Sequence, residues 1–114
     1  MEGCIFCKIV QREIPAQVVY EDEAILAFKD VNPVAPVHVL IIPKEHIAGV
    51  LSLNQEHSEI IKGIWLVIPK LAQELGIADR GFRVVVNSGP AAGQSVPHLH
   101  FHLLGGRALS WPPG

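Results

Sequence analysis

The sequence predicts an α+β fold: a five-stranded antiparallel sheet with one long and one short helix. Five short segments are rich in apolar and β-branched residues, while one longer segment repeats apolar residues at helical spacing. Most of the expected connections are hairpins, and the strand–helix–strand order typical of a parallel sheet is missing.

The first half of the chain supplies a short helix and three strands. Residues 4–10 (CIFCKIV) are expected to form one or two helical turns that Pro15 stops. Residues 17–21 and 24–29 are expected strands joined by an acidic turn. Residues 37–42 (VHVLII) are β-branched and apolar and lie between prolines, which predicts a buried central strand.

The long helix follows this strand. Ser52 and Gln55 fit a capping box at its start, and Gly76 supplies a C-terminal stop. Pro69 lies inside the pattern, so it is expected to kink or break the helix. The apolar residues at helical spacing are Ile60, Ile61, Ile64, Ile68, Leu71 and Leu75.

Two strands are expected after the helix, at residues 81–86 (GFRVVV) and 98–104 (HLHFHLL), with a glycine-rich loop between them. No repeat, low-complexity tract or linker divides residues 1–114, so we expect a single domain.

Composition excludes several classes of function. The 114 residues carry a formal charge of −2 without a Lys/Arg cluster, which argues against nucleic-acid binding. No apolar run approaches the roughly 20 residues of a membrane span, and Met1–Gly3 does not begin an export signal. A cytoplasmic protein with its two cysteines as thiols is expected.

Three of the six histidines are His98, His100 and His102. In a strand they share one face, and the apolar residues between them share the other. Such a row suits two mechanisms. The imidazoles could hold a zinc ion that activates water, or one could attack phosphorus while the others position and protonate.

The loop before the histidines favours phosphorus chemistry. Its glycines let backbone N–H groups approach an anion closely, and Asn87, Gln94 and Ser95 add polar contacts. The loop therefore suggests a phosphate held within reach of a histidine.

The pair Cys4-x-x-Cys7 leaves three interpretations open: a zinc site, a redox pair, or buried inert thiols. His38 in the central strand and His46 beyond it are expected near the sheet face. His57 is expected to be solvated.

Residues 93–104 (GQSVPHLHFHLL) resemble the motif of the histidine-triad (HIT) superfamily. The endings at 104–107 (LGGR) and 111–114 (WPPG) resemble its nucleotide-binding Hint branch more than the dinucleoside polyphosphate hydrolase (Fhit) branch. The resemblance covers essentially the whole chain, including residues 14–16 (IPA).

The resemblance implies one HIT domain that dimerises into a ten-stranded sheet. The implied activity is hydrolysis of purine nucleoside phosphoramidates to AMP or GMP and an amine, with no organic cofactor. Trp111 is followed by Pro-Pro-Gly and needs a docking surface on its own domain or on a partner, which also suggests a homodimer. Trp65 is expected in the core or an interface.

The resemblance also assigns roles. His100 would attack the α-phosphorus and form a nucleotidyl-histidine intermediate that water resolves. His102 would bind phosphate oxygens, Ser95 would lie near the leaving group, and His38 and His98 would orient the nucleophile. The amine must leave protonated, so a proton donor is needed near neutral pH.

The implied substrate contacts fall into three groups. Asp30 would hold the ribose hydroxyls with Val31 beside it. The apolar slot for the base would consist of Ile5, Phe6, Ile9 and Leu40. The loop that binds the phosphate would contribute Asn87, Gly93 and Gln94.

In relatives with Cys-x-x-Cys, the resemblance implies a structural zinc. Its ligands here would be Cys4, Cys7, His46 and His98. His98 would then be a ligand, which leaves His38 and His102 as the titrating partners of His100.

Three alternatives stay open: a dinucleoside polyphosphate hydrolase with the same nucleophile, a purine-nucleotide-binding scaffold with incidental turnover, and a zinc hydrolase using all three motif histidines.

Overall fold

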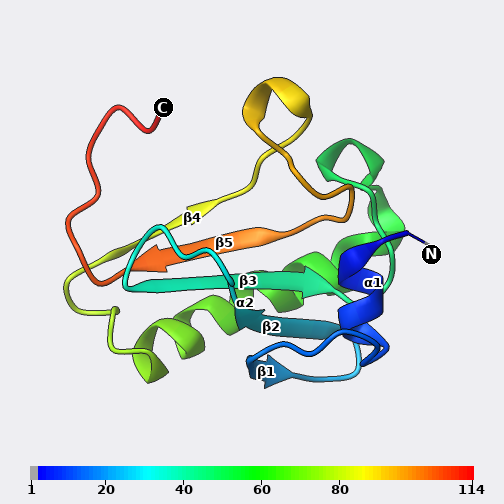
Figure 1. The fold of residues 1–114 in the computed structure, drawn as a ribbon, viewed down its shortest axis with the longest axis horizontal. Coiled ribbons are helices and arrows are strands. Elements are labelled where there is room, and N and C mark those ends of the chain that lie inside the picture. Colours follow the sequence, from blue (N-terminus) through cyan, green and yellow to red (C-terminus); the bar gives the residue numbers. More distant parts are fainter. Residues whose placement is uncertain (1–2) are drawn as a thin grey trace.

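A five-stranded antiparallel sheet lies at the centre of the computed structural model, which describes residues 3–114. The strands are β1 (Val18–Glu21), β2 (Ile25–Lys29), β3 (Val37–Pro43), β4 (Phe82–Val85) and β5 (Phe101–Gly105). Their order is β1-β2-β3-β5-β4, so β3 is central (Figure 1). The predicted α+β class and five-stranded antiparallel sheet are confirmed. Met1 and Glu2, used above in the expectation of no export signal, lie outside the described residues.

Two helices cover opposite faces of the sheet (Figure 1). The long helix α2 (Ser58–Glu74) packs on one face, and the short helix α1 (Ile5–Val10) lies on the other, at one end of the sheet. Both faces of the central strands are therefore apolar, which explains the continuous apolar run of β3. Three single-turn 3₁₀ helices complete the structure: η1 (Val50–Ser52), η2 (Gln55–His57) and η3 (Pro90–Ala92).

Alternation along β3 decides which residues reach each layer. Val39 and Ile41 belong to the buried cluster under α2, whereas Leu40 and Ile42 belong to the cluster under α1. His38 is two residues from Leu40 and so shares its face. The α1 side of the sheet thus combines an apolar floor with a buried histidine.

The long helix begins later than predicted. The capping box is formed by Asn54 and His57 in η2, not by Ser52 and Gln55. The Asn54 side chain accepts from the Glu56 backbone N–H at 2.8 Å, and His57 Nδ1 accepts from the Asn54 backbone N–H at 3.1 Å. This role also corrects the expectation that His57 is merely solvated. An asparagine side-chain oxygen caps a helix as well as a serine hydroxyl does. The helical segment therefore starts after Asn54 and not after Ser52.

Pro69 does not interrupt α2, which runs unbroken to Glu74. A proline leaves the carbonyl four residues earlier, here that of Trp65, without its helical N–H donor. Both residues lie on the exposed side of the helix, where water can satisfy that carbonyl. The predicted stop at Gly76 is correct: Gly76 has φ 75°, and the Ile77 N–H closes the end on the Ala72 carbonyl at 2.9 Å.

Helix α1 ends at Val10, as predicted, although Arg12 at φ 63° turns the chain before Pro15 is reached. Another boundary differs from the prediction. Strand β5 begins only at Phe101, so His98 and His100 lie on the extended segment before it. Among the described residues, no helix is long and apolar enough to cross a lipid bilayer.

Candidate functional site

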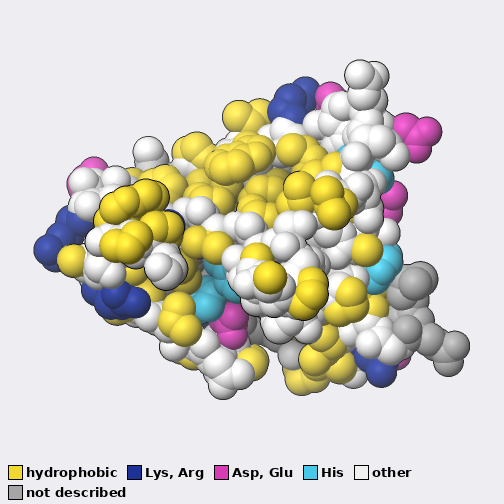
Figure 2. Space-filling view, turned by 90° about the horizontal axis from the view of Figure 1, so that it is seen from above, with side chains coloured by type: hydrophobic (Ala, Val, Ile, Leu, Met, Phe, Trp, Pro, Cys, Tyr) yellow, Lys and Arg dark blue, Asp and Glu magenta, His cyan; other side chains and the backbone are white. Residues whose placement is uncertain are grey.

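A cavity of about 260 Å³ lies between α1, the sheet and the segment before β5. In the space-filling view, histidine surface is visible in a hollow beside acidic surface, with hydrophobic side chains around it (Figure 2). The expected site residues that line the cavity are Ile5, Phe6, Ile9, Asp30, Val31, Leu40, Ser95, His100 and His102. Residues from four distant parts of the chain therefore share one wall.

One ring nitrogen of His100 is hydrogen-bonded and the other is free. Its Nδ1 lies 2.7 Å from the His98 carbonyl oxygen, so Nδ1–H donates this hydrogen bond. The lone pair of the neutral ring is then on Nε2. The ring is only 4% exposed and meets the edge of Phe6, with centroids 5.2 Å apart. This geometry fixes both the tautomer and the orientation of the imidazole, and it leaves a lone pair on Nε2 that could act as a nucleophile.

Beside His100, the His38 side chain lies against those of His102 and Asp30. The Val34 backbone N–H donates to His38 Nδ1 at 3.1 Å, so the proton of neutral His38 is on Nε2. That atom lies 2.9 Å from His102 Nδ1 and 3.3 Å from an Asp30 carboxylate oxygen. His102 Nδ1 accepts, which places the His102 proton on Nε2.

His102 Nε2 is buried and has no hydrogen-bond partner among the described residues. An unpaired buried donor costs free energy, so it favours a ligand that accepts a hydrogen bond there. Because His102 lines the cavity, the acceptor would come from a bound molecule.

Burial keeps these histidines uncharged. It lowers the pKa of His102 to about 4, and the neighbouring His100 and His38 add to the effect. Burial also lowers the pKa of His38, against the opposing pull of the Asp30 carboxylate. The expectation that His38 and His102 titrate near neutral pH therefore does not fit their surroundings. Both act at pH 7 as neutral hydrogen-bonding groups.

Three expected substrate contacts do not line the cavity: Asn87, Gly93 and Gln94. Gln94 uses both ends of its amide inside the protein. Its oxygen accepts from the Gly89 N–H at 3.0 Å, and its nitrogen donates to the Ala48 and Val96 carbonyls at 2.9 and 3.1 Å. It holds the glycine-rich loop in place and so positions the neighbouring Ser95.

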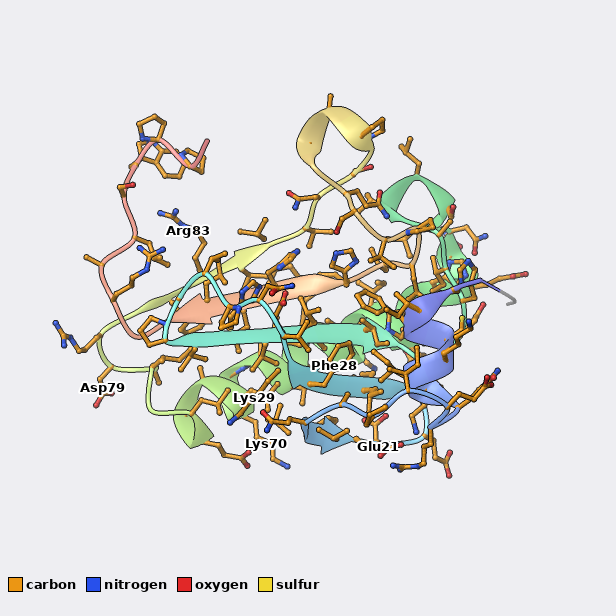
Figure 3. All side chains as sticks on the ribbon, viewed as in Figure 1. Glu21, Phe28, Lys29, Lys70, Asp79 and Arg83 are labelled. Atoms are coloured by element: carbon orange, nitrogen blue, oxygen red, sulfur yellow. The ribbon has the colours of Figure 1, made fainter. Side chains whose placement is uncertain are left out.

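Sequence reasoning missed part of the lining. Phe28 and Lys29 come from β2, which was read only as a strand, and both are labelled in Figure 3. The signal for Phe28 was the alternation of β2, which places it on the same face as Leu26 under α1. The other unassigned lining residues are Ile14, Pro15, Ala16 and Val96.

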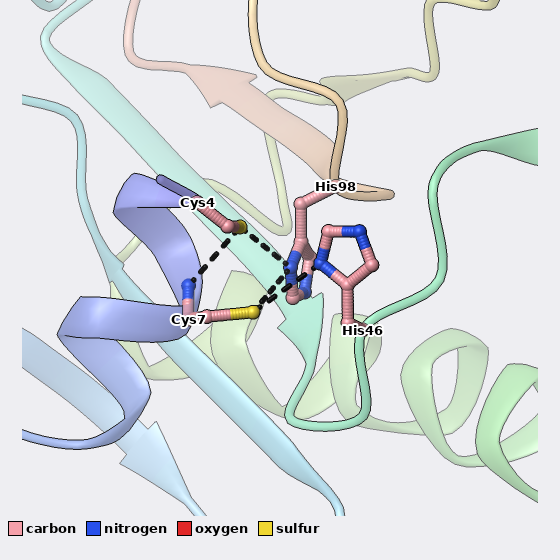
Figure 4. A group of neighbouring side chains, drawn as sticks. All are labelled: Cys4, Cys7, His46 and His98. Atoms are coloured by element: carbon pink, nitrogen blue, oxygen red, sulfur yellow. Dashed lines mark hydrogen bonds between the residues drawn. The ribbon is translucent and has the colours of Figure 1, made fainter. Parts of the chain in front are cut away.

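A second cluster lies at the start of α1 (Figure 4). The ligand atoms of Cys4, Cys7, His46 and His98 all lie within 4.8 Å of one another. Cys4 Sγ lies 3.4 Å from His98 Nδ1, and Cys7 Sγ lies 3.3 Å from His46 Nδ1 and 3.6 Å from His98 Nδ1. Sulfur and nitrogen ligands of a tetrahedral zinc lie roughly 3.5 Å apart. The donor set therefore fits zinc, as predicted.

The surroundings of His98 prepare it as a neutral ligand. His98 Nε2–H donates to the Pro43 carbonyl at 2.8 Å, which leaves the Nδ1 lone pair facing the two sulfurs. Burial lowers the pKa of His98 and raises the pKa of the Cys7 thiol, so without a metal these two side chains prefer to be neutral.

Asp30, His38 and His102 also lie within metal-ligand distance of one another. They fit a metal poorly, because His38 Nδ1 already accepts the Val34 N–H and its Nε2 carries the proton. A metal on Nε2 would leave this ring without any proton. The arrangement disfavours a zinc hydrolase built on the motif histidines, since His98 also faces the cysteines.

Comparisons with known proteins agree with this geometry. The HIT domain family model matches residues 11–109. A HIT-like protein of Synechococcus elongatus is 53% identical over 99% of this chain and 98% of its own, and a 14 kDa zinc-binding protein of Zea mays is 51% identical over 96% and 87%. A structure of a HIT family hydrolase from Legionella pneumophila superimposes with a TM-score of 0.96, at 53% identity over 98% of this chain and all of the other. On the strength of the family match and these identities, the chain belongs to the HIT domain family.

Proposed function

We propose that this protein is a hydrolase of nucleoside phosphoramidates of the Hint type, acting through a covalent intermediate on His100. The observation that carries the proposal is the fixed tautomer of His100, whose free nitrogen belongs to a ring lining the cavity. The HIT family hydrolases of similar structure support the reaction class.

In the first step, His100 Nε2 attacks the α-phosphorus and the P–N bond breaks. The electron pair of that bond goes to nitrogen, which takes up one proton and leaves as the amine. The new imidazolium keeps its Nδ1–H bond to the His98 carbonyl, and this contact stabilises the positive charge that forms on the ring.

In the second step, water attacks phosphorus and the Nε2–P bond breaks, which returns the lone pair to His100. The water releases one proton, which balances the proton taken up by the amine. We assign both proton transfers to the Ser95 hydroxyl, because Ser95 lines the cavity and is exposed. It would relay the first proton from solvent to the leaving nitrogen and the second from the attacking water back to solvent. His102 is neutral and serves as a hydrogen-bond donor.

The role of His102 follows from its unpaired Nε2–H. A phosphoryl oxygen gains negative charge as phosphorus is attacked, and an unpaired donor on a ring that lines the cavity would stabilise that charge without reorganising. His38 and Asp30 hold the His102 ring in the tautomer that presents this donor.

The rest of the cavity suits a nucleoside. Apolar side chains from α1 and the sheet offer a slot for a purine, and Asp30 at its rim offers carboxylate oxygens to ribose hydroxyls. AMP derivatives are therefore the proposed substrates. Zinc bound by Cys4, Cys7, His46 and His98 would cross-link α1 to the segment before β5 and would take no part in these steps.

We also propose that the active form is a homodimer. Strand β4 ends the sheet, so pairing with a second β4 would extend it to ten strands. Trp65 on α2 is 49% exposed while its ring meets Phe101 of β5 at 5.7 Å, so an apolar surface lies close to this edge. The C-terminal tail is held by Arg83 of β4, which donates to the Ser110 carbonyl at 2.9 Å and lies 5.9 Å from the Trp111 ring (Figure 3).

The test is intact mass spectrometry after incubation with adenosine 5′-phosphoramidate and a quench that preserves P–N bonds. The wild type should gain an adenylyl group and release AMP, whereas His100→Ala should do neither. Asp79→Asn, an exposed substitution away from the cavity, should behave as the wild type. AMP formation by His100→Ala at the wild-type rate would contradict the mechanism.

Two further outcomes identify the alternatives. Faster cleavage of diadenosine polyphosphates than of phosphoramidates would assign the protein to the dinucleoside polyphosphate hydrolases. Tight AMP binding without turnover would favour a nucleotide-binding scaffold.

A further inference from the structure

The metal cluster and the cavity share parts of the chain at two places. Helix α1 is six residues long, and Cys4 at its N-cap and Cys7 within it belong to the cluster. Ile5, Phe6 and Ile9 of the same short helix line the cavity. A helix of this length has little stability of its own, so its position depends on what its side chains contact.

The second shared place is His98. Its ring Nδ1 faces both cysteine sulfurs, while its backbone carbonyl accepts the hydrogen bond from His100 Nδ1 at 2.7 Å. One residue therefore supplies a metal ligand through its side chain and fixes the nucleophile through its main chain.

Phe6 connects the two places. Its ring meets the His98 ring at 5.9 Å and the His100 ring at 5.2 Å, both edge to face. Any movement of α1 that opens the cysteine pair also moves Phe6 against both histidines.

We propose that metal binding at Cys4, Cys7, His46 and His98 and nucleotide binding in the cavity are thermodynamically coupled, each increasing the affinity for the other. The inference rests on the proposed nucleotide site. Metal bound to the cluster holds α1 and His98 in the positions that complete the cavity wall. A nucleotide packed against α1 and His100 in turn holds the four ligands together.

Coupling of this kind is reciprocal, because both ligands bias the same arrangement. Couplings between sites in proteins are typically about 5- to 150-fold. We expect zinc to tighten AMP binding by about tenfold, and AMP to tighten zinc binding by the same factor.

The experiment measures both sides of this cycle on the full chain. AMP affinity is measured by calorimetry with zinc-loaded and chelator-stripped protein. Zinc affinity is measured by competition with a chromophoric chelator, with and without saturating AMP, corrected for the binding of zinc to AMP alone. Equal factors above about fivefold support the coupling, and AMP affinities that agree within twofold overturn it.

Hydrogen exchange separates this inference from the nucleotide proposal, because it needs no nucleotide. Zinc should slow exchange at residues 5–10 and 99–102, while the amides of α2 (58–74) stay protected with or without metal. Unchanged exchange at the first two segments overturns the coupling. If AMP binds neither form but zinc gives this protection, the proposed nucleotide site fails while the mechanical link stands.

Two variants locate the connection. Phe6→Leu keeps all four metal ligands, so it should bind zinc nearly as the wild type does. The factor by which zinc tightens AMP binding should be much smaller in this variant. His46→Ala removes a ligand that comes from neither α1 nor the cavity wall, and it should weaken AMP binding about as much as stripping the metal does. If zinc tightened AMP binding as much in Phe6→Leu as in the wild type, the role given to the Phe6 ring would be overturned.

Discussion

At the scale of single residues, hydrogen-bond direction decides what each histidine can do. The Val34 N–H fixes the proton of His38 on Nε2, and that proton in turn fixes the tautomer of His102. The His98 carbonyl fixes His100. In one row of identical side chains, His98 thus has its Nδ1 facing the cysteines, His100 has a free lone pair on Nε2, and His102 has an unpaired Nε2–H, because each ring has a different partner.

The low pKa of His102 predicts a pH dependence of stability. Its pKa is about 4 in the folded protein and about 6.5 in the unfolded chain, so the unfolded state binds the proton more readily in between. The free energy of unfolding should therefore fall as pH drops from about 6.5 to about 4, with no contribution from His102 above this range.

Urea unfolding of wild type and His102→Gln across this range measures the effect. Protonation of the metal ligands is common to both proteins, so the difference between the two curves isolates His102. The stability advantage of the wild type should shrink steadily toward pH 4. Curves that stay parallel would show that His102 is not a buried neutral group.

Gln94 supports a second prediction at this scale. Replacing it with Ala removes three hydrogen bonds that hold the glycine-rich loop, each contributing about 0.5–1.5 kcal/mol. Gln94→Ala should lower the free energy of unfolding by about 1.5–4.5 kcal/mol, as measured in urea. The KM for phosphoramidates should rise because Ser95 loses its position. Gln73→Ala on the exposed side of α2 is the control and should change neither value.

At the scale of elements, Gly105 in β5 lies so close to Ile77, which follows α2, that no side chain fits there. A Cβ there would lie 2.8–2.9 Å from three atoms of buried Ile77, including Ile77 Cβ, which cannot move away alone. Gly63 in α2 differs, since its Cβ would meet only the terminal Cδ1 of Ile25, at 2.9 Å.

Gly105→Ala should therefore destabilise the protein by about 1–3 kcal/mol, as overpacking does. Gly63→Ala should cost far less, because alanine gains about 1 kcal/mol of helix propensity there. Thermal unfolding of both variants provides the comparison. Adding Ile77→Ala to Gly105→Ala should cost less than the sum of the single changes, and strict additivity would argue against the contact.

At the scale of the whole molecule, the proposed homodimer predicts a change of mass. Trp65→Arg places a charge on the exposed apolar surface next to the β4 edge, so it should shift the protein toward the monomer in light scattering. Leu51→Arg is the control, because Leu51 is 93% exposed in η1 and should leave the mass unchanged. A wild type that runs as a monomer at micromolar concentration would remove the dimer from the proposal.

The sequence by itself determined the local elements and their faces. The five strand segments, the stop at Gly76 and the alternation of residues 98–103 follow from side-chain periodicity and backbone preference, which act over a few residues. The predicted capping box of Ser52 and Gln55 was wrong, because several polar residues in succession could cap the helix and Asn54 does so. The metal ligands were named from a resemblance, and their spacing alone left other uses of the two thiols open.

Only the tertiary structure decided which groups meet and what state they are in. Strand β5 lies beside β3, which brings His102 within 2.9 Å of His38, 64 residues earlier. The same folding buries His102 and lowers its pKa to about 4, a value that a sequence motif does not contain. Proximity and desolvation depend on segments far apart in the chain, and they exist only once the core has closed around them.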